Sequence, residues 1–215
     1  MIARLQAHWR SLGPATRLLL GIWTVGSIAG LSIGLIDTVA WLRLDRTTLR
    51  ELHLWRLATY ALVADDVFGL IFGGLFLAWL GSAVERHWER GWFLTYYLVC
   101  AAGAGLALAL FTHLPQRGWL TNVGALMGLA VAWYDLHRGQ PFALFGGPVV
   151  SARTAAALII GCLLLPVAMG QGWKVAACLA LGALTGRLAL QVRHGRAGRR
   201  AARAADKSRM GRLEW

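Results

Sequence analysis

Long uncharged stretches alternate with short charged ones along this chain. A stretch of about 20 such residues is long enough to cross a hydrocarbon core of roughly 30 Å as an α-helix. Five stretches carry no charged residue, and a sixth is interrupted only by Arg187. They cover residues 18–36, 67–84, 91–116, 118–134, 154–173 and 175–192. The pattern predicts an all-α membrane protein with six transmembrane helices.

The charged residues divide the chain into three regions. Residues 1–17 form a basic leader, residues 18–192 the six-helix membrane domain, and residues 193–215 a basic tail rich in Ala and Arg. The first apolar run has 19 residues and no A-x-A-like cleavage site. It is longer than the apolar core of a typical signal peptide, so we expect a retained anchor.

The distribution of Lys and Arg predicts the orientation in the membrane. With the leader inside, 15 of the 22 basic residues lie in cytoplasmic segments and six lie on the opposite side. Since cytoplasmic loops carry the excess of positive charge, we expect both termini in the cytoplasm. An even number of spans agrees with that topology. The Arg-, Ala- and Gly-rich composition favours a bacterial inner membrane.

Composition supports this class of protein. Apolar residues make up 57% of the chain and charged residues 15%, against about 45–50% and 25% in soluble domains. The three cysteines all fall in apolar runs and form no C-x-x-C motif, so neither a disulfide framework nor a zinc site is expected. No cofactor is expected either.

The only long connection, between the first two runs, is expected to lie in the membrane interface. Residues 37–66 hold nine charged residues interleaved with Trp and Leu, a pattern typical of an amphipathic interfacial segment. Asp65 and Asp66, at its end, are interpreted as helix N-terminal caps. Glu85 and Arg86 are interpreted as a charge pair at a helix end, and Arg187 as an arginine that snorkels to the membrane surface.

Glycines at four-residue spacing predict helix contacts. The pairs Gly69/Gly73, Gly124/Gly128 and Gly182/Gly186 lie in the second, fourth and sixth runs. Small residues at this spacing let helices in lipid approach each other closely. We therefore expect these three spans to pack together.

Several motifs resemble the rhomboid family of intramembrane peptidases. A Trp-Arg pair precedes the second run, a Gly-x-x-x-Glu-x-x-x-x-x-Gly motif ends it, and a Gly-x-x-x-Gly motif lies in the sixth run. The resemblance covers roughly residues 40–190 and implies a rhomboid-like six-helix bundle with an interfacial first loop. The matching positions of this structural motif are Trp55, Arg56, Glu85, Gly91, Gly182 and Gly186. For Trp55 and Arg56, two roles remain open: an interfacial anchor, or an arginine that donates hydrogen bonds to carbonyls of the folded first loop.

The resemblance implies a peptidase chemistry for which this chain lacks the residues. In the family, a serine on span four attacks, a histidine on span six takes its proton, and a histidine and an asparagine on span two bind the oxyanion. Such a hydroxyl needs a neighbouring base to become a nucleophile. The corresponding positions here hold Leu120 for the nucleophile, Leu179 for the base, and Gly69 and Gly73 for the oxyanion donors. Thr121 is the hydroxyl nearest to the nucleophile position and has no histidine to activate it. We therefore expect a pseudoprotease, not an enzyme.

The resemblance to inactive rhomboids and derlins implies a binding function. We expect the chain to bind transmembrane segments of other membrane proteins, for client recognition, chaperoning or handover, along a partly hollow apolar groove at Gly69 and Gly73. The basic tail is expected to bind anionic lipids, and nucleic acid is not an expected partner. One alternative is a rhomboid serine protease with a non-standard active site. Another is a small transporter, which the lack of paired ionisable residues and of an inverted repeat in the spans disfavours.

Overall fold

The apolar runs of the sequence are helices in the structure. The computed structural model describes residues 12–31, 41–45, 47–64, 66–112, 120–143 and 149–210. Most of the leader, Asp65 and the last five residues of the tail therefore lie outside the described residues. The apolar helices are α2 (Pro14–Leu31), a π-helix η2 (Gly69–Gly73) that continues as α6 (Gly74–Glu85), α7 (Arg90–Phe111), α8 (Val123–Leu136), α9 (Ala152–Gln171) and α10 (Trp173–Met210).

Four of these helices are long and apolar enough to cross a membrane. They are α2, α7, α9 and the Trp173–Gly195 part of α10. The segment Gly69–Glu85 and α8 are shorter apolar helices. α8 has 14 residues, which corresponds to about 21 Å at ~1.5 Å per residue. The chain is thus a mostly helical, multi-pass membrane protein. Of the six expected spans, four are long enough to cross a membrane and two are shorter apolar helices.

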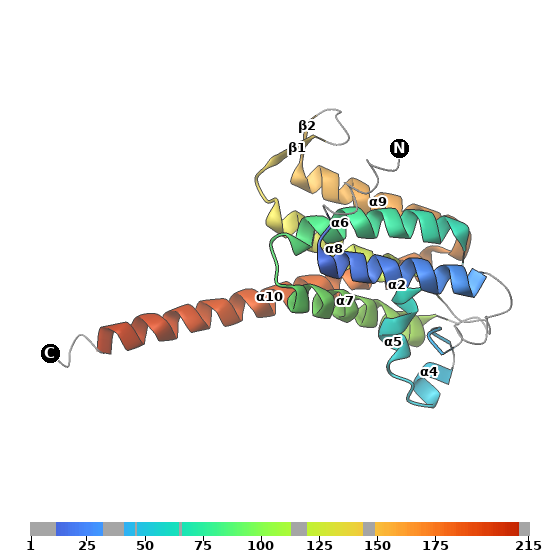
Figure 1. The fold of residues 1–215 in the computed structure, drawn as a ribbon, viewed down its shortest axis with the longest axis horizontal. Coiled ribbons are helices and arrows are strands. Elements are labelled where there is room, and N and C mark those ends of the chain that lie inside the picture. Colours follow the sequence, from blue (N-terminus) through green and yellow to red (C-terminus); the bar gives the residue numbers. More distant parts are fainter. Residues whose placement is uncertain are drawn as a thin grey trace.

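α8 lies at the centre of the bundle. It packs against α6, α7, α9 and α10, and every residue from Gly124 to Ala130 is buried. α2 packs against α6, and α10 packs along α7 as well as α8 (Figure 1). Because α8 is enclosed by other helices, little of its surface faces lipid, and its length need not match the thickness of the hydrocarbon core.

Glycines bring α8 and α10 together at backbone distance. A Cβ atom on Gly182 would lie 2.1 Å from the carbonyl oxygen of Gly124, and one on Gly186 would lie 3.0 Å from Cα of Gly128. Two of the three expected glycine pairs therefore form a close helix contact, as small residues do in lipid. The second span also packs against α8, through α6, so α8 contacts both of the other expected spans. The glycines of its own pair do not form that contact, because Gly69 and Gly73 lie in the π-helix η2, where Asp66 lies beside Gly69, and Asn122 and Trp23 lie beside Gly73.

The first loop folds into short helices at one end of the bundle. α4 (Thr47–Arg50), α5 (Arg56–Thr59) and the 3₁₀ turn η1 (Tyr60–Leu62) follow one another there, and α5 packs against α7 (Figure 1). Leu44 is buried beneath this region. Exposed on it are Trp41, Leu52, Leu54 and Trp55. This mixture of buried and exposed apolar residues agrees with an interfacial loop.

The connection from α8 to α9 contains a small antiparallel hairpin. β1 (Pro141–Ala143) pairs with β2 (Val149–Ser151), with Pro141 opposite Ser151. The spacing of the apolar runs predicts only a short connection here. Strands of three residues are too short to show an alternating pattern of apolar and polar positions.

The start of α2 and residue 193 of α10 lie at the same end of the bundle. The end of α6 binds the start of α2 through Glu85 and Ala15, and the guanidinium of Arg193 lies 4.9 Å from the ring centre of Trp88. α10 then continues past the other helices to Met210 (Figure 1). The helix therefore runs unbroken through the expected start of the tail at residue 193.

Candidate functional site

The two positions that the rhomboid resemblance assigned to a nucleophile and a base are buried leucines near the start of α8. Leu120 lies three residues before the first residue of α8 and Leu179 comes from α10, and both belong to the hydrophobic core. A Cβ atom on Gly124, in the first turn of α8, would lie 3.5 Å from Cδ2 of Leu179. The site that would carry the chemistry is thus packed with aliphatic side chains.

Gly73 faces this region, but the space beside it is filled. A Cβ atom there would lie 2.7 Å from Oδ1 of Asn122 and 2.9 Å from Cζ2 of Trp23. The expected partly hollow groove is therefore wrong for this position, because α2 supplies an indole that occupies it. A leucine at residue 73 would displace Trp23 or Asn122 rather than fill an empty space.

Gly69 has different surroundings from Gly73. Its backbone N–H donates a hydrogen bond to Oδ1 of Asp66, and a Cβ atom on it would lie 3.2 Å from the same oxygen. This contact confirms that Asp66 caps the start of the second apolar helix. The two glycines do not form one face open to a partner helix.

Asn122 is a buried polar residue that no sequence motif indicates. Its Nδ2 donates to the carbonyl oxygen of Gly73 at 3.2 Å, and Nε1 of Trp23 donates to the carbonyl oxygen of Leu70 at 3.3 Å. Both carbonyls belong to the π-helix η2, whose wide turn interrupts the regular α-helical ladder. Backbone polar groups in a membrane need internal partners, so these two side chains stabilise the π-helix. The only sequence signal was a lone Asn in an apolar run.

Thr121, the nearest hydroxyl, takes part in a backbone turn. Its N–H donates to the carbonyl oxygen of Tyr60 at 3.1 Å, and its Oγ1 accepts a hydrogen bond from the N–H of Val123 at 3.4 Å. No histidine occurs between His137 and His194. Within the described ranges, no group of three or more His, Cys, Asp or Glu residues is arranged to hold a metal ion. The hydrogen bonds of Thr121 and Asn122 thus fix the backbone around the start of α8.

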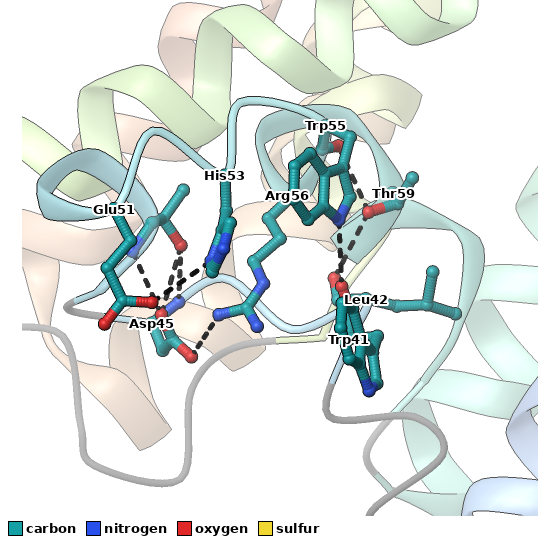
Figure 2. A network of polar contacts seen from close by, with 9 residues as sticks. Trp41, Leu42, Asp45, Glu51, His53, Trp55, Arg56 and Thr59 are labelled. Atoms are coloured by element: carbon teal, nitrogen blue, oxygen red, sulfur yellow. Dashed lines mark hydrogen bonds and ion pairs between the residues drawn. The ribbon is translucent and has the colours of Figure 1, made fainter.

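The Trp55-Arg56 pair organises the first loop. Nη1 of Arg56 lies 2.6 Å from Oδ2 of Asp45, with both side chains largely shielded from solvent. Figure 2 shows this ion pair beside the indole of Trp55, whose Nε1 donates to the carbonyl oxygen of Trp41 at 3.3 Å. The acceptor Asp45 was not identified from the sequence. An arginine with a carboxylate partner fixes the loop more strongly than a neutral pair would.

Asp45 connects this ion pair to the next turn of the loop. Its Oδ1 accepts hydrogen bonds from the N–H of Thr48 at 3.1 Å and from the Thr48 hydroxyl at 3.2 Å. Thr59 donates to the carbonyl oxygen of Leu42 at 3.4 Å. α4 and α5 are thereby tied to residues 41–45 (Figure 2).

Glu85 caps α2 instead of pairing with Arg86. Its carboxylate accepts hydrogen bonds from the N–H of Ala15 at 2.8 Å, the N–H of Thr16 at 2.8 Å and the Thr16 hydroxyl at 2.7 Å. α2 has no acidic residue in its first turn, so Glu85 supplies the negative charge that a helix N-terminus favours. Arg86 is exposed and donates to the carbonyl oxygen of Ser82. The expected charge pair is therefore wrong.

The remaining motif glycines differ in what surrounds them. Gly182 and Gly186 form the α8–α10 contact described above, where a side chain has no room. Gly91 is exposed at the start of α7, and a Cβ atom there would meet nothing within 4 Å. The packing does not explain a glycine at that position.

Taken together, the fold defines an integral, multi-pass helical membrane protein. Residues 17–116 match the sequence profile of a family described as eukaryotic integral membrane protein (DUF1751). The match runs from α2 to the end of α7 and contains Trp55, Arg56 and Glu85. The chain is similar to that family over this part. The family's eukaryotic description counts against the bacterial inner membrane favoured by composition. No curated protein matches the chain.

Proposed function

We propose that this chain is a non-catalytic, rhomboid-like membrane protein that binds transmembrane segments of other membrane proteins. The observation that carries the proposal is the packing of Leu120 and Leu179 in the core, at the positions where the rhomboid family has its nucleophile and base. Aliphatic side chains there provide neither a nucleophile nor a proton acceptor. The six apolar helices follow one another in the order expected for a six-span rhomboid-like bundle, which supports the architecture we propose.

Binding would take place on the outer surface of the second apolar helix. In the rhomboid family, substrates enter sideways between spans two and five. Here the interior beside Gly73 is filled, so a client helix would dock outside it. The exposed apolar side chains on this surface are Val67, Phe68, Ile71, Phe72 and Leu75. The rings of Phe68 and Phe72 lie 4.2 Å apart, and a client can pack against them through dispersion contacts.

The π-helix supports this choice of surface. Single π-turns within α-helices occur frequently at functional sites, and residues 69–73 coincide with the positions of the family's oxyanion residues. Asn122 and Trp23 bind two of its carbonyls from the inner side. The altered turn presents Ile71 and Phe72 outward, where they can contact a partner.

Site-specific crosslinking in native membranes tests the proposal. A photo-reactive residue at Ile71, which is 58% exposed, should form adducts with other membrane proteins. The matched control is Leu110 on α7, which is 59% exposed and should form adducts mainly with lipid. Phe68→Ala with Phe72→Ala should abolish the protein adducts at residue 71. Equal protein adducts at both positions, or lipid adducts alone, would overturn the docking surface.

Activity probes test the non-catalytic part of the proposal separately. The purified protein should not cleave rhomboid model substrates and should not react with fluorophosphonates. Leu120→Ser combined with Leu179→His should restore little activity, because oxyanion donors contribute a factor of about 100–1000 each and residues 69 and 73 supply no side-chain donor. Labelling that disappears in Thr121→Ala would instead support a protease with a non-standard active site.

A further inference from the structure

A cavity of about 990 Å³ opens between the end of α8, the hairpin, the start of α9 and the last membrane-embedded turns of α10. It lies at the same end of the bundle as the start of α2, because its wall residue Asp135 contacts His194, next to Arg193. The client surface on residues 67–75 takes no part in it. The cavity is therefore independent of the function proposed above.

Three arginines from three different elements line this cavity. Arg138 lies in the turn after α8, Arg153 in the first turn of α9, and Arg187 in α10. The one carboxylate in the wall, Asp135, already has two nitrogen neighbours: Nε of Arg138 at 3.6 Å and Nε2 of His194 at 3.7 Å. The wall therefore carries more positive than negative charge. Positive charges gathered in one concave site favour an anionic ligand.

Tyr134 orients two of the arginines. Nε of Arg153 donates to its hydroxyl at 3.2 Å, and the guanidinium of Arg138 lies 5.3 Å from its ring centre. Arg187 makes no ion pair with any residue that the structure describes. Guanidinium groups bind phosphate through two parallel N–H donors. One oriented pair and one uncommitted arginine suit a phosphate group.

The surroundings of Arg187 indicate a lipid rather than a soluble phosphate. Arg187 lies within the Trp173–Gly195 segment, which is apolar enough to cross a membrane. Its neighbours Leu184 and Leu188 are both more than half exposed, as expected for side chains that face acyl chains. Val131, Val150 and Ala152 add apolar surface to the cavity itself. A ligand that carries both a phosphate group and hydrocarbon chains matches the arginines of the cavity and the apolar surface beside them.

We propose that this cavity binds the headgroup of an anionic phospholipid, with its phosphate between Arg138, Arg153 and Arg187 and its acyl chains beside Leu184 and Leu188. Basic pockets between membrane helices are suited to such headgroups. The expectation drawn from the sequence concerned the tail after residue 193, whereas this site lies within the bundle. Arg187 thereby becomes a ligand-binding residue in addition to one that snorkels.

Titration of the full-length protein in neutral detergent, with native mass spectrometry as the readout, tests the proposal. The probes are phosphatidylglycerol, phosphatidylcholine and inorganic phosphate. We expect one phosphatidylglycerol to bind more tightly than phosphatidylcholine, and inorganic phosphate not to displace it. Arg138→Gln with Arg187→Gln should weaken phosphatidylglycerol binding about 30-fold, and Arg187→Gln alone about fivefold. The single variant removes no described ion pair, so it remains informative if the double variant does not fold.

A matched control removes the same charge elsewhere at this end. Arg86→Gln with Arg90→Gln should change the affinity for phosphatidylglycerol less than about twofold, because neither residue lines the cavity and distant charges are screened by salt. Equal losses in both double variants would overturn the site in favour of general charge attraction. Equal binding of phosphatidylcholine would overturn the requirement for an anion. Displacement by inorganic phosphate would reassign the cavity to a soluble anion.

Discussion

Glu85 is a single side chain that joins two spans. Its carboxylate accepts three hydrogen bonds from the first turn of α2, and it is only 7% exposed. Gly13 makes this approach possible, since a Cβ atom there would lie 2.1 Å from Oε2 of Glu85. The contact combines a helix cap with a buried negative charge at the positive end of a helix dipole.

Glu85→Ala should lower the free energy of unfolding by about 2 kcal/mol or more, because charge-assisted hydrogen bonds are lost and buried donors are left unsatisfied. Glu85→Gln should cost less, since one amide oxygen can still accept. Thermal unfolding in detergent measures both. Arg86→Ala is the control, because its side chain is exposed and bonds only within its own helix turn, and it should leave the transition unchanged. Equal effects of the two alanine variants would contradict the cap.

Gly182 tests the contact between α8 and α10. Gly182→Ala places a methyl group 2.1 Å from the carbonyl oxygen of Gly124, so the helices must separate. Overpacking of this kind costs about 1–3 kcal/mol. The control is Gly161→Ala in α9, where a Cβ atom would meet nothing within 4 Å. That variant should be neutral or stabilising by about 0.5–1 kcal/mol. A stable Gly182→Ala would refute the backbone contact.

The sequence predicted the roles of residues that act on their neighbours in the chain better than the roles of residues that act on distant segments. The alignment implied by the resemblance identifies Leu120 and Leu179 as the dyad positions without any long-range contact, and Asp66 caps the helix that begins beside it. Asn122 and Glu85 act on partners far along the chain, and no periodicity reports such a distance. The resemblance marked Glu85 as a motif position, but only the structure provides its acceptor role.

At the scale of elements, the first loop has an ion pair at its centre. Asp45 precedes α4 in the sequence and Arg56 follows it, so their ion pair closes the loop that contains α4. Asp45 also accepts two hydrogen bonds from Thr48. Loss of either partner should therefore loosen the same set of turns.

A double-mutant cycle on Arg56→Ala and Asp45→Ala should give a coupling free energy of about 1–3 kcal/mol, as expected for a shielded, charge-assisted bond. Each single variant should also increase protease cleavage within residues 41–62, because the loop opens more often. Arg50→Ala is a control in the same loop, with an exposed arginine. A coupling near zero would show that the ion pair does not hold the loop.

The element pattern explains which helices could be foreseen. Uncharged runs predicted all six apolar helices, because exclusion of charge from lipid leaves a signal over about 20 residues. The shortness of α8 could not be foreseen, since its enclosure depends on neighbours from four other elements. The π-helix is a local departure of five residues, and each of the two strands of the hairpin has only three. Neither is accompanied by a change in composition.

The extension of α10 beyond the bundle carries a prediction about lipid. The basic residues after Arg193 should bind an anionic surface, with each Lys or Arg near it contributing about 1 kcal/mol. A peptide of residues 193–215 should bind phosphatidylglycerol vesicles and dissociate as salt rises, and should bind phosphatidylcholine vesicles weakly at any salt. Equal binding to both vesicles would contradict an electrostatic tail.

At the scale of the whole molecule, both ends of the membrane domain point to one side. The end of α6, the turn after α8 and Arg193 all meet at the end where α2 begins. An even number of crossings follows from this arrangement. The excess of basic residues in the same segments predicts that this side is the cytoplasm.

Reporter fusions after residue 12 and after residue 195 should therefore both report a cytoplasmic position, and a fusion within residues 47–52 should report the opposite side. The fusion in the first loop acts as the internal control, because it must differ from the other two in any even-span arrangement. Reporters on opposite sides for the two ends would contradict the six-span topology.

The cap on α2 also sets an order of events during synthesis. Ala15 and Glu85 are 70 residues apart, and ribosomes add about 5–20 residues per second. For roughly 4 to 14 s the first helix therefore exists without the carboxylate that closes its amino end. α2 is therefore complete well before the side chain that caps it has been made. Glu85→Ala would leave the amino end of α2 without this carboxylate after the second apolar helix has been made as well.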